Sequence, residues 1–367
     1  FEHLMFGPTR KRSLGDFDRL VERAGAEANA ATWTDWTYYY ENAPRAALPL
    51  LIELEADRMA NLVLRAPQVS SEKEVVANER KLRVDDDVEG RALELLYAKA
   101  FRRHSYRWPT IGWMKDIRGF TVRDCREFYR AHYAPSNATL IIAGDFDERK
   151  TLSAVQRHYG AFSAAKLPEP QPREKEPVQR AERVFVLPAP TSTERLLIGY
   201  RAPSFCDSDT PALVIANEVL FGGRSSRLHR LLCVEEETAV SVRGSIAPFI
   251  EPGLYEIWIL IREGQPKERA LALFDREVER LGSEGPTALE LEKAISQLEL
   301  SFLHSMETAG GKAEQIGFYE TVAGDGAAVF DRLAAYRDVE AADVRRAVTK
   351  YLRPSRRTRV EIVPKAS

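Results

Sequence analysis

The chain opens with the stretch Phe1-Glu2-His3-Leu4-Met5-Phe6-Gly7-Pro8-Thr9. A glutamate followed directly by a histidine forms the last two positions of the zinc motif H-x-x-E-H, whose first histidine would lie two positions before Phe1. In that motif the two histidines bind Zn²⁺ from one face of a helix, and the glutamate polarises the metal-bound water. A Glu-His pair also occurs by chance, so the pair alone favours a surface pair at a chain terminus.

A second stretch, residues 70–80, places two carboxylates on one helical face. The S-x-x-E run from Ser71 to Glu74 has the spacing of a capping box and predicts that a helix begins there. A solvated charged helix is the simplest interpretation, but a carboxylate on an apolar stripe needs a partner or a metal, because unpaired burial is costly. Two histidines and one glutamate are a common ligand set of open zinc sites. One face of the helix carries, at i, i+3, i+4 and i+7, the side chains of Glu72, Val75, Val76 and Glu79.

The two stretches resemble the zinc motifs of the pitrilysin/insulinase family of peptidases, the inverzincins, in which the opening run is H-x-x-E-H-x-x-F-x-G-T. The chain is most similar to the bacterial half-length members of that family. In its second half, the run from Phe221 to Leu228 resembles the glycine-rich turn G-G-x-S-S-R-L. Further similar runs occur in the family's order along the chain: Asn29-Ala30 with Thr32, Tyr38-Tyr39-Tyr40, Leu54–Met59, Tyr133–Leu140 and Gly144–Phe146.

The resemblance implies a zinc-dependent endopeptidase subunit. Glu2 would be the general base that activates the zinc-bound water. His3 and Glu79 would be zinc ligands, together with the histidine expected before Phe1. Glu72 would stand behind the ligands and hold a ligand histidine in its tautomer. Two alternatives stay open: a non-catalytic relative that acts as a structural or assembly subunit, and an unrelated metal hydrolase.

Residues Asn29, Ala30, Ala31 and Thr32 are predicted to contact the substrate. Small side chains leave the backbone N–H and C=O groups of an edge strand free for an incoming peptide. In the family, the equivalent strand lies at a sheet edge beside the zinc and accepts the substrate as an added β-strand. Without the resemblance, a purely structural edge strand is an equally good interpretation.

The second half departs from the family pattern at two positions. Self-sufficient family members carry an arginine and a tyrosine seven residues apart after the glycine-rich turn, thought to hold the scissile carbonyl, whereas this chain has Cys233 and Val240 there. Neither side chain can donate a charge-assisted hydrogen bond to an oxyanion. The resemblance therefore implies a heterodimer, in which a second family subunit brings the Arg/Tyr pair. A homodimer remains possible if Arg230 or Arg243 substitutes for the pair.

Composition limits the classes of function. The chain has 367 residues, of which 44% are hydrophobic and 29% charged, so it is long enough for two cores. A net charge of −2 gives no reason to expect nucleic acid or an anionic membrane as a partner, and no apolar run approaches the length of a membrane span. Cys125, Cys206 and Cys233 form no C-x-x-C motif, so neither a disulfide framework nor a cysteine zinc site is indicated. The compartment stays open between periplasm and cytoplasm.

The chain divides into two halves around residues 166–182, where four prolines within twelve residues predict an extended linker. Each half contains an aspartate followed 11 residues later by proline and 4 residues after that by threonine, first from Asp124 and again from Asp343. This repeat predicts a helix and then a strand in both halves. We therefore expect an α+β protein of two tandem homologous domains, 1–165 and 183–367, each a mixed, mostly antiparallel sheet backed by helices.

Within the first domain, periodicity and composition predict four elements. A helix from Asp16 to Ala24 ends at a glycine, and a second amphipathic helix runs from Ala46 to Leu62. Residues 26–33 and 36–41, rich in Thr, Trp and Tyr, form a hairpin around Thr34-Asp35. Residues 138–143 form a short apolar strand, internal to a sheet.

Overall fold

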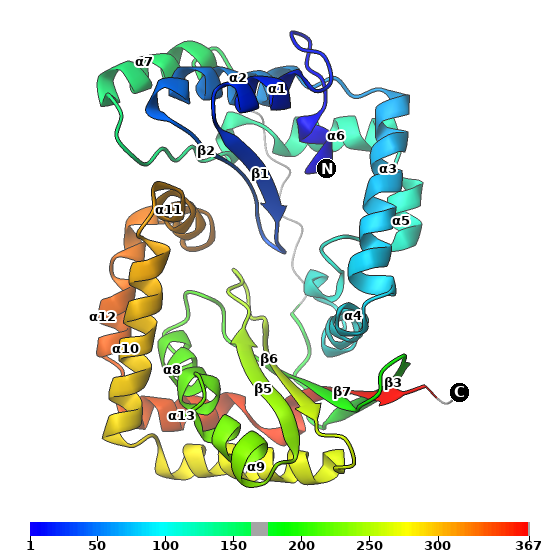
Figure 1. The fold of residues 1–367 in the computed structure, drawn as a ribbon, viewed down its shortest axis with the longest axis vertical. Helices are drawn as coiled ribbons and strands as arrows, with labels where there is room; N and C mark the ends of the chain where they lie inside the picture. Colours follow the sequence, from blue (N-terminus) through cyan, green and yellow to red (C-terminus); the bar gives the residue numbers. More distant parts are fainter. Residues whose placement is uncertain (163–174, 366–367) are drawn as a thin grey trace. The chain divides into compact units, whose positions relative to one another are not determined.

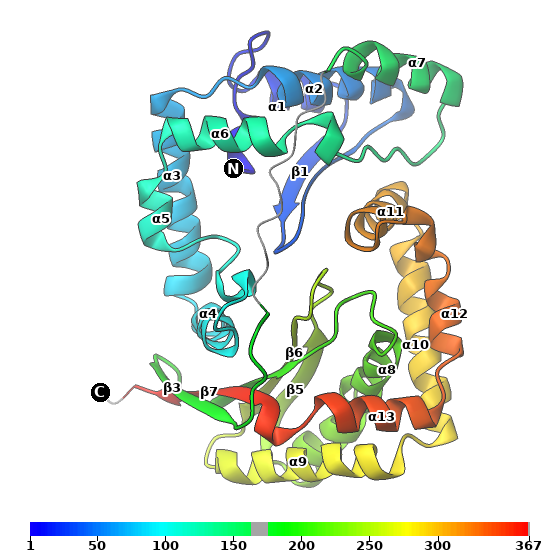
Figure 2. The same ribbon diagram turned by 180° about the vertical axis from the view of Figure 1, so that it is seen from behind.

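The computed structural model describes residues 1–162 and 175–365 and divides the chain into two compact units (Figures 1 and 2). Each unit combines segments from both halves of the sequence, whereas the sequence predicts contiguous domains. Residues 166–174 of the expected linker lie outside the described residues. Unit 1 consists of Phe1–Arg80, Thr110–Arg173 and Ser305–Gly326, and unit 2 consists of Lys81–Pro109, Glu174–His304 and Ala327–Ser367.

Unit 1 is built from helices around a β-hairpin. The helix predicted for 16–24, the hairpin and the helix predicted for 46–62 are confirmed to within about two residues at each end. Its apolar side chains form two clusters, one around Leu4 and Met5 and the other around Phe17 and Leu54. The elements are the 3₁₀ turn η1 (His3–Phe6), β1 (Glu27–Thr32), β2 (Thr37–Asn42), α1 (Asp16–Arg23), α2 (Leu48–Asn61), α3 (Ala66–Arg80), α5 (Met114–Gly119), α6 (Val122–His132), α7 (Glu148–Tyr159) and α11 (Ala309–Ala323).

Helix α3 differs from the prediction in its start and in its buried face. It begins at Ala66, one turn before Ser71, because Pro67 is favoured in a first turn and the Gln68 side chain accepts the backbone N–H of Arg65 (3.3 Å). The predicted apolar stripe is wrong in part, since Val75 is 45% exposed. The residues of α3 that are buried are Val69, Ala77 and Arg80.

The strand predicted at residues 138–143 does not form; this segment belongs to no described sheet. Its counterpart in the repeat, β7 (Arg357–Pro364), does form, because β3 and β4 flank it and hydrogen bond to it on both sides. Each repeat copy begins with a helix whose aspartate, Asp124 or Asp343, completes a capping box. The local sequence signal is therefore the same in both copies. A strand forms only in the second copy, where neighbouring strands are present to pair with it.

Unit 2 contains a five-stranded sheet of order β3-β7-β4-β6-β5, in which only β3 and β7 are parallel (Figure 1). Alternating side chains of β4 enter two different clusters, with Leu196, Ile198 and Tyr200 on one face and Leu197 on the other. This sheet and the hairpin of unit 1 confirm the α+β class. The strands are β3 (Arg183–Ala189), β4 (Arg195–Arg201), β5 (Ala239–Ile246), β6 (Leu254–Ile261) and β7.

Helices cover both faces of this sheet. One face packs against α8 (Thr210–Phe221), α9 (Lys267–Glu284) and α13 (Ala341–Tyr351), and the other against α4 (Val88–Ala100). Helix α4 comes from the first half of the sequence, and it approaches closely because β4 has no side chain at Gly199. A Cβ there would lie 3.0 Å from the Leu96 side chain. Helices α10 (Ala288–Ser305) and α12 (Arg332–Arg337) complete the helical part.

Unit 1 receives a helix from the second half in the same way. Helix α11 packs against β2, and its Phe318 ring makes an edge-to-face contact with Trp36, the residue before β2, with ring centroids 5.0 Å apart. No helix in the described ranges, 1–162 and 175–365, is both long and apolar enough to cross a membrane.

Candidate active site

The Glu2-His3 pair sits at the start of the 3₁₀ turn η1, which two neighbouring residues anchor. Leu4 and Met5 are buried, and the Phe1 ring packs against Tyr133 of the segment after α6 with ring centroids 4.8 Å apart. The backbone of Glu2 is already helical, with φ −44° and ψ −53°. Because the apolar residues on both sides are fixed, the polar pair is held in one orientation.

The imidazole of His3 lies between the two carboxylates that α3 carries on one face. Its Nδ1 is 3.4 Å from Glu72 Oε2, and its Nε2 is 3.5 Å from Glu79 Oε2. Seven residues of helix span about 10.5 Å, so one ring reaches both acids by placing a nitrogen toward each. The structure therefore brings together the residues predicted as ligands and the residue predicted to stand behind them.

The distances fit the beginning of a zinc site. Two ligands at about 2.0–2.2 Å from a tetrahedral ion lie about 3.3–3.6 Å apart, which matches the His3 Nε2 to Glu79 separation. Metal-binding histidines usually offer their other nitrogen to a carboxylate, as Nδ1 does here to Glu72. Within the described parts of the chain, however, no group of three His, Cys, Asp or Glu side chains is arranged to hold a metal ion. His3 and Glu79 could supply two of the three protein ligands that an open zinc site needs.

Glu2 is tied to the end of strand β1. The hydroxyl of Thr32 donates a hydrogen bond to Glu2 Oε2, and the Thr37 hydroxyl donates in turn to Thr32 Oγ1 (3.2 Å). Thr32 is predicted as part of the substrate-binding strand, and the sequence does not indicate its contact with the predicted base. The bond engages one of the two carboxylate oxygens, Oε2.

The predicted substrate strand is β1, and it pairs with β2 alone among the described strands. Asn29 folds its side-chain oxygen back onto the N–H of Ala30 (2.8 Å), and Ala30 and Ala31 offer only methyl groups. The second edge of β1 therefore has backbone groups without a strand partner within the described residues, and it runs toward the Glu2 end of the site.

A buried arginine of α2 packs against the hairpin through Tyr39 of β2. Arg58 is 2% exposed, and its guanidinium lies over the rings of Phe6, Phe17 and Tyr39 at 4.6–5.2 Å. Its guanidinium lies 2.6 Å from the Glu55 carboxylate and 3.3 Å from the side chain of Glu41. Burial, together with the hydrogen bond that it shares with Glu55, raises the pKa of Glu41 to about 9. The sequence indicates only a family similarity for the Leu54–Met59 run, because neighbouring opposite charges do not reveal that a side chain is buried.

Asp57, which precedes Arg58 in α2, fixes the loop after η1. Asp57 Oδ2 accepts hydrogen bonds from the Thr9 hydroxyl (2.6 Å) and from Arg12 (2.5 Å), and its Oδ1 accepts one from Asn61 (2.7 Å). Thr9 also forms an isolated β-bridge with Leu62. The threonine of the opening motif thus anchors the segment that follows the Glu2-His3 pair to α2.

In unit 2, Cys233 and Val240 are the two positions that the sequence predicts in place of the family's Arg/Tyr pair. Cys233 is half-buried on the π-helical turn η6 (His229–Glu235), and burial raises the pKa of its thiol. Val240 is 54% exposed at a β-bulge near the start of β5. The two candidate substitutes are already paired, Arg230 with Glu235 (2.9 Å) and Arg243 with Glu89 (2.5 Å).

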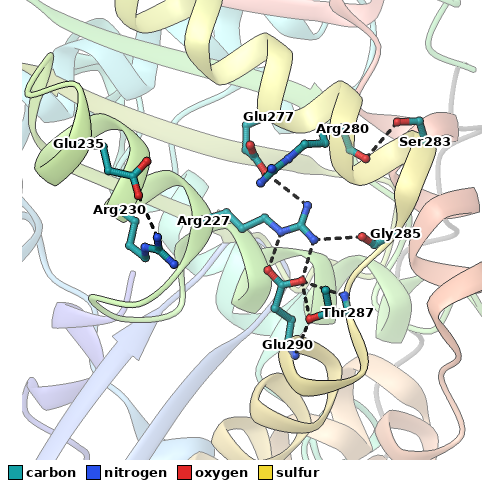
Figure 3. A network of polar contacts seen from close by, with 9 residues as sticks. All are labelled: Arg227, Arg230, Glu235, Glu277, Arg280, Ser283, Gly285, Thr287 and Glu290. Carbon is teal, nitrogen blue, oxygen red and sulfur yellow. Dashed lines mark hydrogen bonds and ion pairs between the residues drawn. The ribbon is translucent and has the colours of Figure 1, made fainter.

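The glycine-rich turn before these positions is fixed by one arginine (Figure 3). Arg227 donates through Nε and NH2 to the two oxygens of Glu290, each at 2.7 Å. The same guanidinium reaches Glu277 (3.3 Å) and the carbonyl of Gly285 (3.0 Å). The arginine of the S-S-R-L run therefore joins the turn to α9 and α10, a structural role for which the sequence gives no separate signal.

Comparisons with known proteins identify the family of the chain. Residues 1–112 match the family described as insulinase (peptidase family M16), and residues 119–298 match the peptidase M16 inactive domain. The zinc protease PqqE of Helicobacter pylori is 29% identical over 99% of this chain and 82% of its own length. An uncharacterised zinc protease of Streptomyces coelicolor is 28% identical over 94% of this chain and 75% of its own length.

A solved structure extends the similarity to three dimensions. The crystal structure of a protease from Helicobacter pylori has a TM-score of 0.92 and 26% identity to this chain, and the similarity covers 99% of this chain and 88% of that one. The two M16 matches follow one another over most of the sequence, and relatives named zinc proteases extend over nearly all of it. The chain therefore belongs to the pitrilysin/insulinase family of peptidases, M16.

Proposed function

We propose that the chain is the zinc-bearing subunit of an endopeptidase. The observation that carries the proposal is the position of His3, with one ring nitrogen toward Glu79 and the other toward Glu72. The preceding residue, Glu2, accepts a hydrogen bond from the Thr32 hydroxyl. His3 and Glu79 would hold the metal together with a histidine two positions before Phe1. A zinc ion in this place would supply Lewis acidity and lower the pKa of a water molecule.

Glu2 is the general base in this proposal. Its Oε2 is held by the Thr32 hydroxyl, so Oε1 is the atom that takes the proton from the attacking water. As the water oxygen bonds to the carbonyl carbon and the C–N bond breaks, the same oxygen returns the proton to the leaving amine. Glu72 keeps the His3 ring oriented through Nδ1. The substrate would bind as an extended strand along the second edge of β1, with its main chain hydrogen bonded to residues 29–32.

The experiment uses a chain extended so that a histidine and one spacer residue precede Phe1, mixed with a second family subunit that carries the R-x₆-Y pair, and measures cleavage of an internally quenched peptide. Glu2→Gln should retain zinc and lower the turnover by about 10²–10⁴, because the amide keeps the shape of the carboxylate but cannot accept the proton. Glu74→Gln, on an exposed position of α3, is the matched control and should leave turnover unchanged. Unchanged turnover in Glu2→Gln, with zinc content intact, would place the base elsewhere.

We further propose that catalysis needs a second family subunit that carries the Arg/Tyr pair, and that the two form the chamber in which peptides are cleaved. Cys233 and Val240 support this, because neither can stabilise a developing oxyanion. An active homodimer would require Arg230 or Arg243 to break its ion pair, with Glu235 or Glu89 respectively, and to bind the oxyanion instead.

The alternative is a non-catalytic subunit with a structural or assembly role. The match of residues 119–298 to the peptidase M16 inactive domain leaves this alternative open. Zinc content distinguishes the alternatives, since a structural subunit has no need of His3 to hold a metal.

A further inference from the structure

The tip of the hairpin carries an exposed tryptophan in a fixed orientation. Trp33 is 55% exposed, yet its ring stacks on Trp36 with ring centroids 6.1 Å apart and an interplanar angle of 26°. Its backbone N–H donates to the Trp36 carbonyl (2.8 Å), which continues the hairpin ladder past the last strand residues. Trp36 is held in turn by the edge-on contact with Phe318 of α11. The exposed indole is therefore a supported apolar surface, and a large exposed aromatic group of this kind is typical of a binding contact.

The position of this indole follows from strand alternation. On one face of the hairpin, Thr32 contacts Glu2 and Tyr39 packs on Phe6. Side chains of neighbouring residues point to the opposite face. There Trp36 contacts α11, and the Tyr38 hydroxyl donates to Glu314 of the same helix (3.4 Å). Trp33 stacks on Trp36, so it belongs to this opposite face and directly follows the residue that holds the predicted base.

A peptide strand added to β1 would have the same alternation. Where one of its residues faces Glu2, the adjacent side chain points to the face that carries Ala31 and Trp33. Ala31 has only a methyl group and leaves space there, while Trp33 offers the flat side of its ring. An aromatic side chain of the peptide fits this surface best, because offset or edge-on ring pairs add to the gain from apolar burial.

We propose that Trp33 is a specificity-determining residue, and that it selects extended peptides with an aromatic side chain next to the bond that faces Glu2. The inference rests on the proposed function insofar as it takes β1 to be the peptide-binding strand. It goes beyond that function by naming the substrate class and the residue that reads it.

The test measures equilibrium binding, with a chelator present so that no peptide is cleaved. Fluorescein-labelled peptides that differ only by Phe or Ala at one scanned position are titrated with the chain, and anisotropy gives the Phe-over-Ala preference. The wild type should show a preference of about tenfold at one position, the size that a single apolar contact gives. Trp33→Ala and Trp33→Thr should abolish it, and Trp33→Phe should keep most of it. Threonine has a high β-propensity, so Trp33→Thr keeps the test usable if the alanine variant does not fold.

The matched control is Trp108→Ala, which removes a tryptophan of similar exposure, 60%, from unit 2 and should leave the preference unchanged. An unchanged preference in both Trp33 loss variants would overturn the inference, as would equal binding of the Phe and Ala peptides by the wild type. A preference for Arg over Phe would also overturn it, because it would show a cation over the ring. If the chain binds through Trp33, but an extended, zinc-loaded chain mixed with a partner that carries the R-x₆-Y pair cleaves nothing, the inference stands and the proposed function falls. If the chain cleaves peptides but its Phe-over-Ala preference does not depend on Trp33, the proposed function stands and the inference falls.

Discussion

Replacement of Arg227 by methionine should destabilise unit 2 strongly, whereas the same change at Arg230 should have little effect. Arg227 is 9% exposed at its side chain and faces Glu277, which is 8% exposed. Breaking a buried ion pair from one side costs about 3–5 kcal/mol, because it leaves a buried charge behind. Arg280 also donates to Glu277 (2.8 Å), so we expect a loss of about 3 kcal/mol, at the lower end of that range.

Arg230 is the matched control, because it lies one turn away and also pairs with a glutamate (Figure 3). That pair is exposed, with 63% of Arg230 and 50% of Glu235 accessible, and exposed pairs contribute about 0–1 kcal/mol. The measurement is urea unfolding at neutral pH, with hydrogen exchange of α9 and α10 reporting on unit 2. Equal free energies of unfolding for the two variants would refute the role assigned to Arg227.

The pH dependence of stability gives an independent check on Arg227 through its other carboxylate partner, Glu290. The hydrogen bond from Arg227 lowers the pKa of Glu290 to about 2, from an ordinary value of 4.5. A lowered carboxyl pKa stabilises the folded state above pH 4.5, and this contribution disappears as the pH falls toward 2. The stability difference between wild type and Arg227→Met should therefore narrow below pH 4.5. A difference that stays constant down to pH 2 would show that Glu290 does not depend on Arg227.

Three further predictions concern unit 1 and catalysis. Because the pKa of Glu41 is raised from 4.5 to about 9, its contribution to stability is full below pH 4.5 and is lost as the pH rises toward 9. Glu41→Gln should make the stability of unit 1 decline less steeply between pH 4.5 and pH 9. Hydrogen exchange of α2 measures this stability, and a pH dependence equal to that of the wild type would contradict the prediction. A partner with the R-x₆-Y pair should raise the activity of the extended chain by about 10²–10³ for each oxyanion donor that it supplies, and loss of the partner's arginine should cancel the gain in a peptide assay. Arg243→Ala should leave the partner-stimulated rate unchanged, since Arg243 pairs with Glu89; complete loss of activity would mean that this arginine stabilises the oxyanion.

The sequence predicted the positions of the candidate ligands better than the helix that carries them. Periodicity alone places Glu72 and Glu79 on one face, and the H-x-x-E-H pattern selects His3. The buried face of α3 was missed because Arg80 fills a core position, with a hydrogen bond to the Gly112 carbonyl (2.8 Å) and a contact with the Trp113 ring. A pattern of charged and apolar letters places such an arginine in solvent, whereas its long side chain and planar head can be buried against partners distant in sequence.

The remaining differences arise from contacts between distant segments. The repeat signal is the same at residues 138–143 and in β7, but only β7 has strands on both sides. Helices α4 and α11 each pack in the unit formed mainly by the other half of the sequence. An amphipathic pattern shows that a helix has a face to bury, and it carries no information on which sheet will cover that face.

Zinc content measured after exhaustive dialysis tests the central proposal most directly. The chain extended to carry a histidine two positions before Phe1 should retain one zinc ion per chain, and His3→Ala or Glu79→Gln should each remove it. Glu74→Gln should retain it, because this glutamate is exposed on another part of α3. The chain that starts at Phe1 should retain much less zinc, since two protein ligands are too few for an open site. One equivalent retained by the chain that starts at Phe1, or by the extended His3→Ala chain, would contradict the assignment of His3 and Glu79 as ligands.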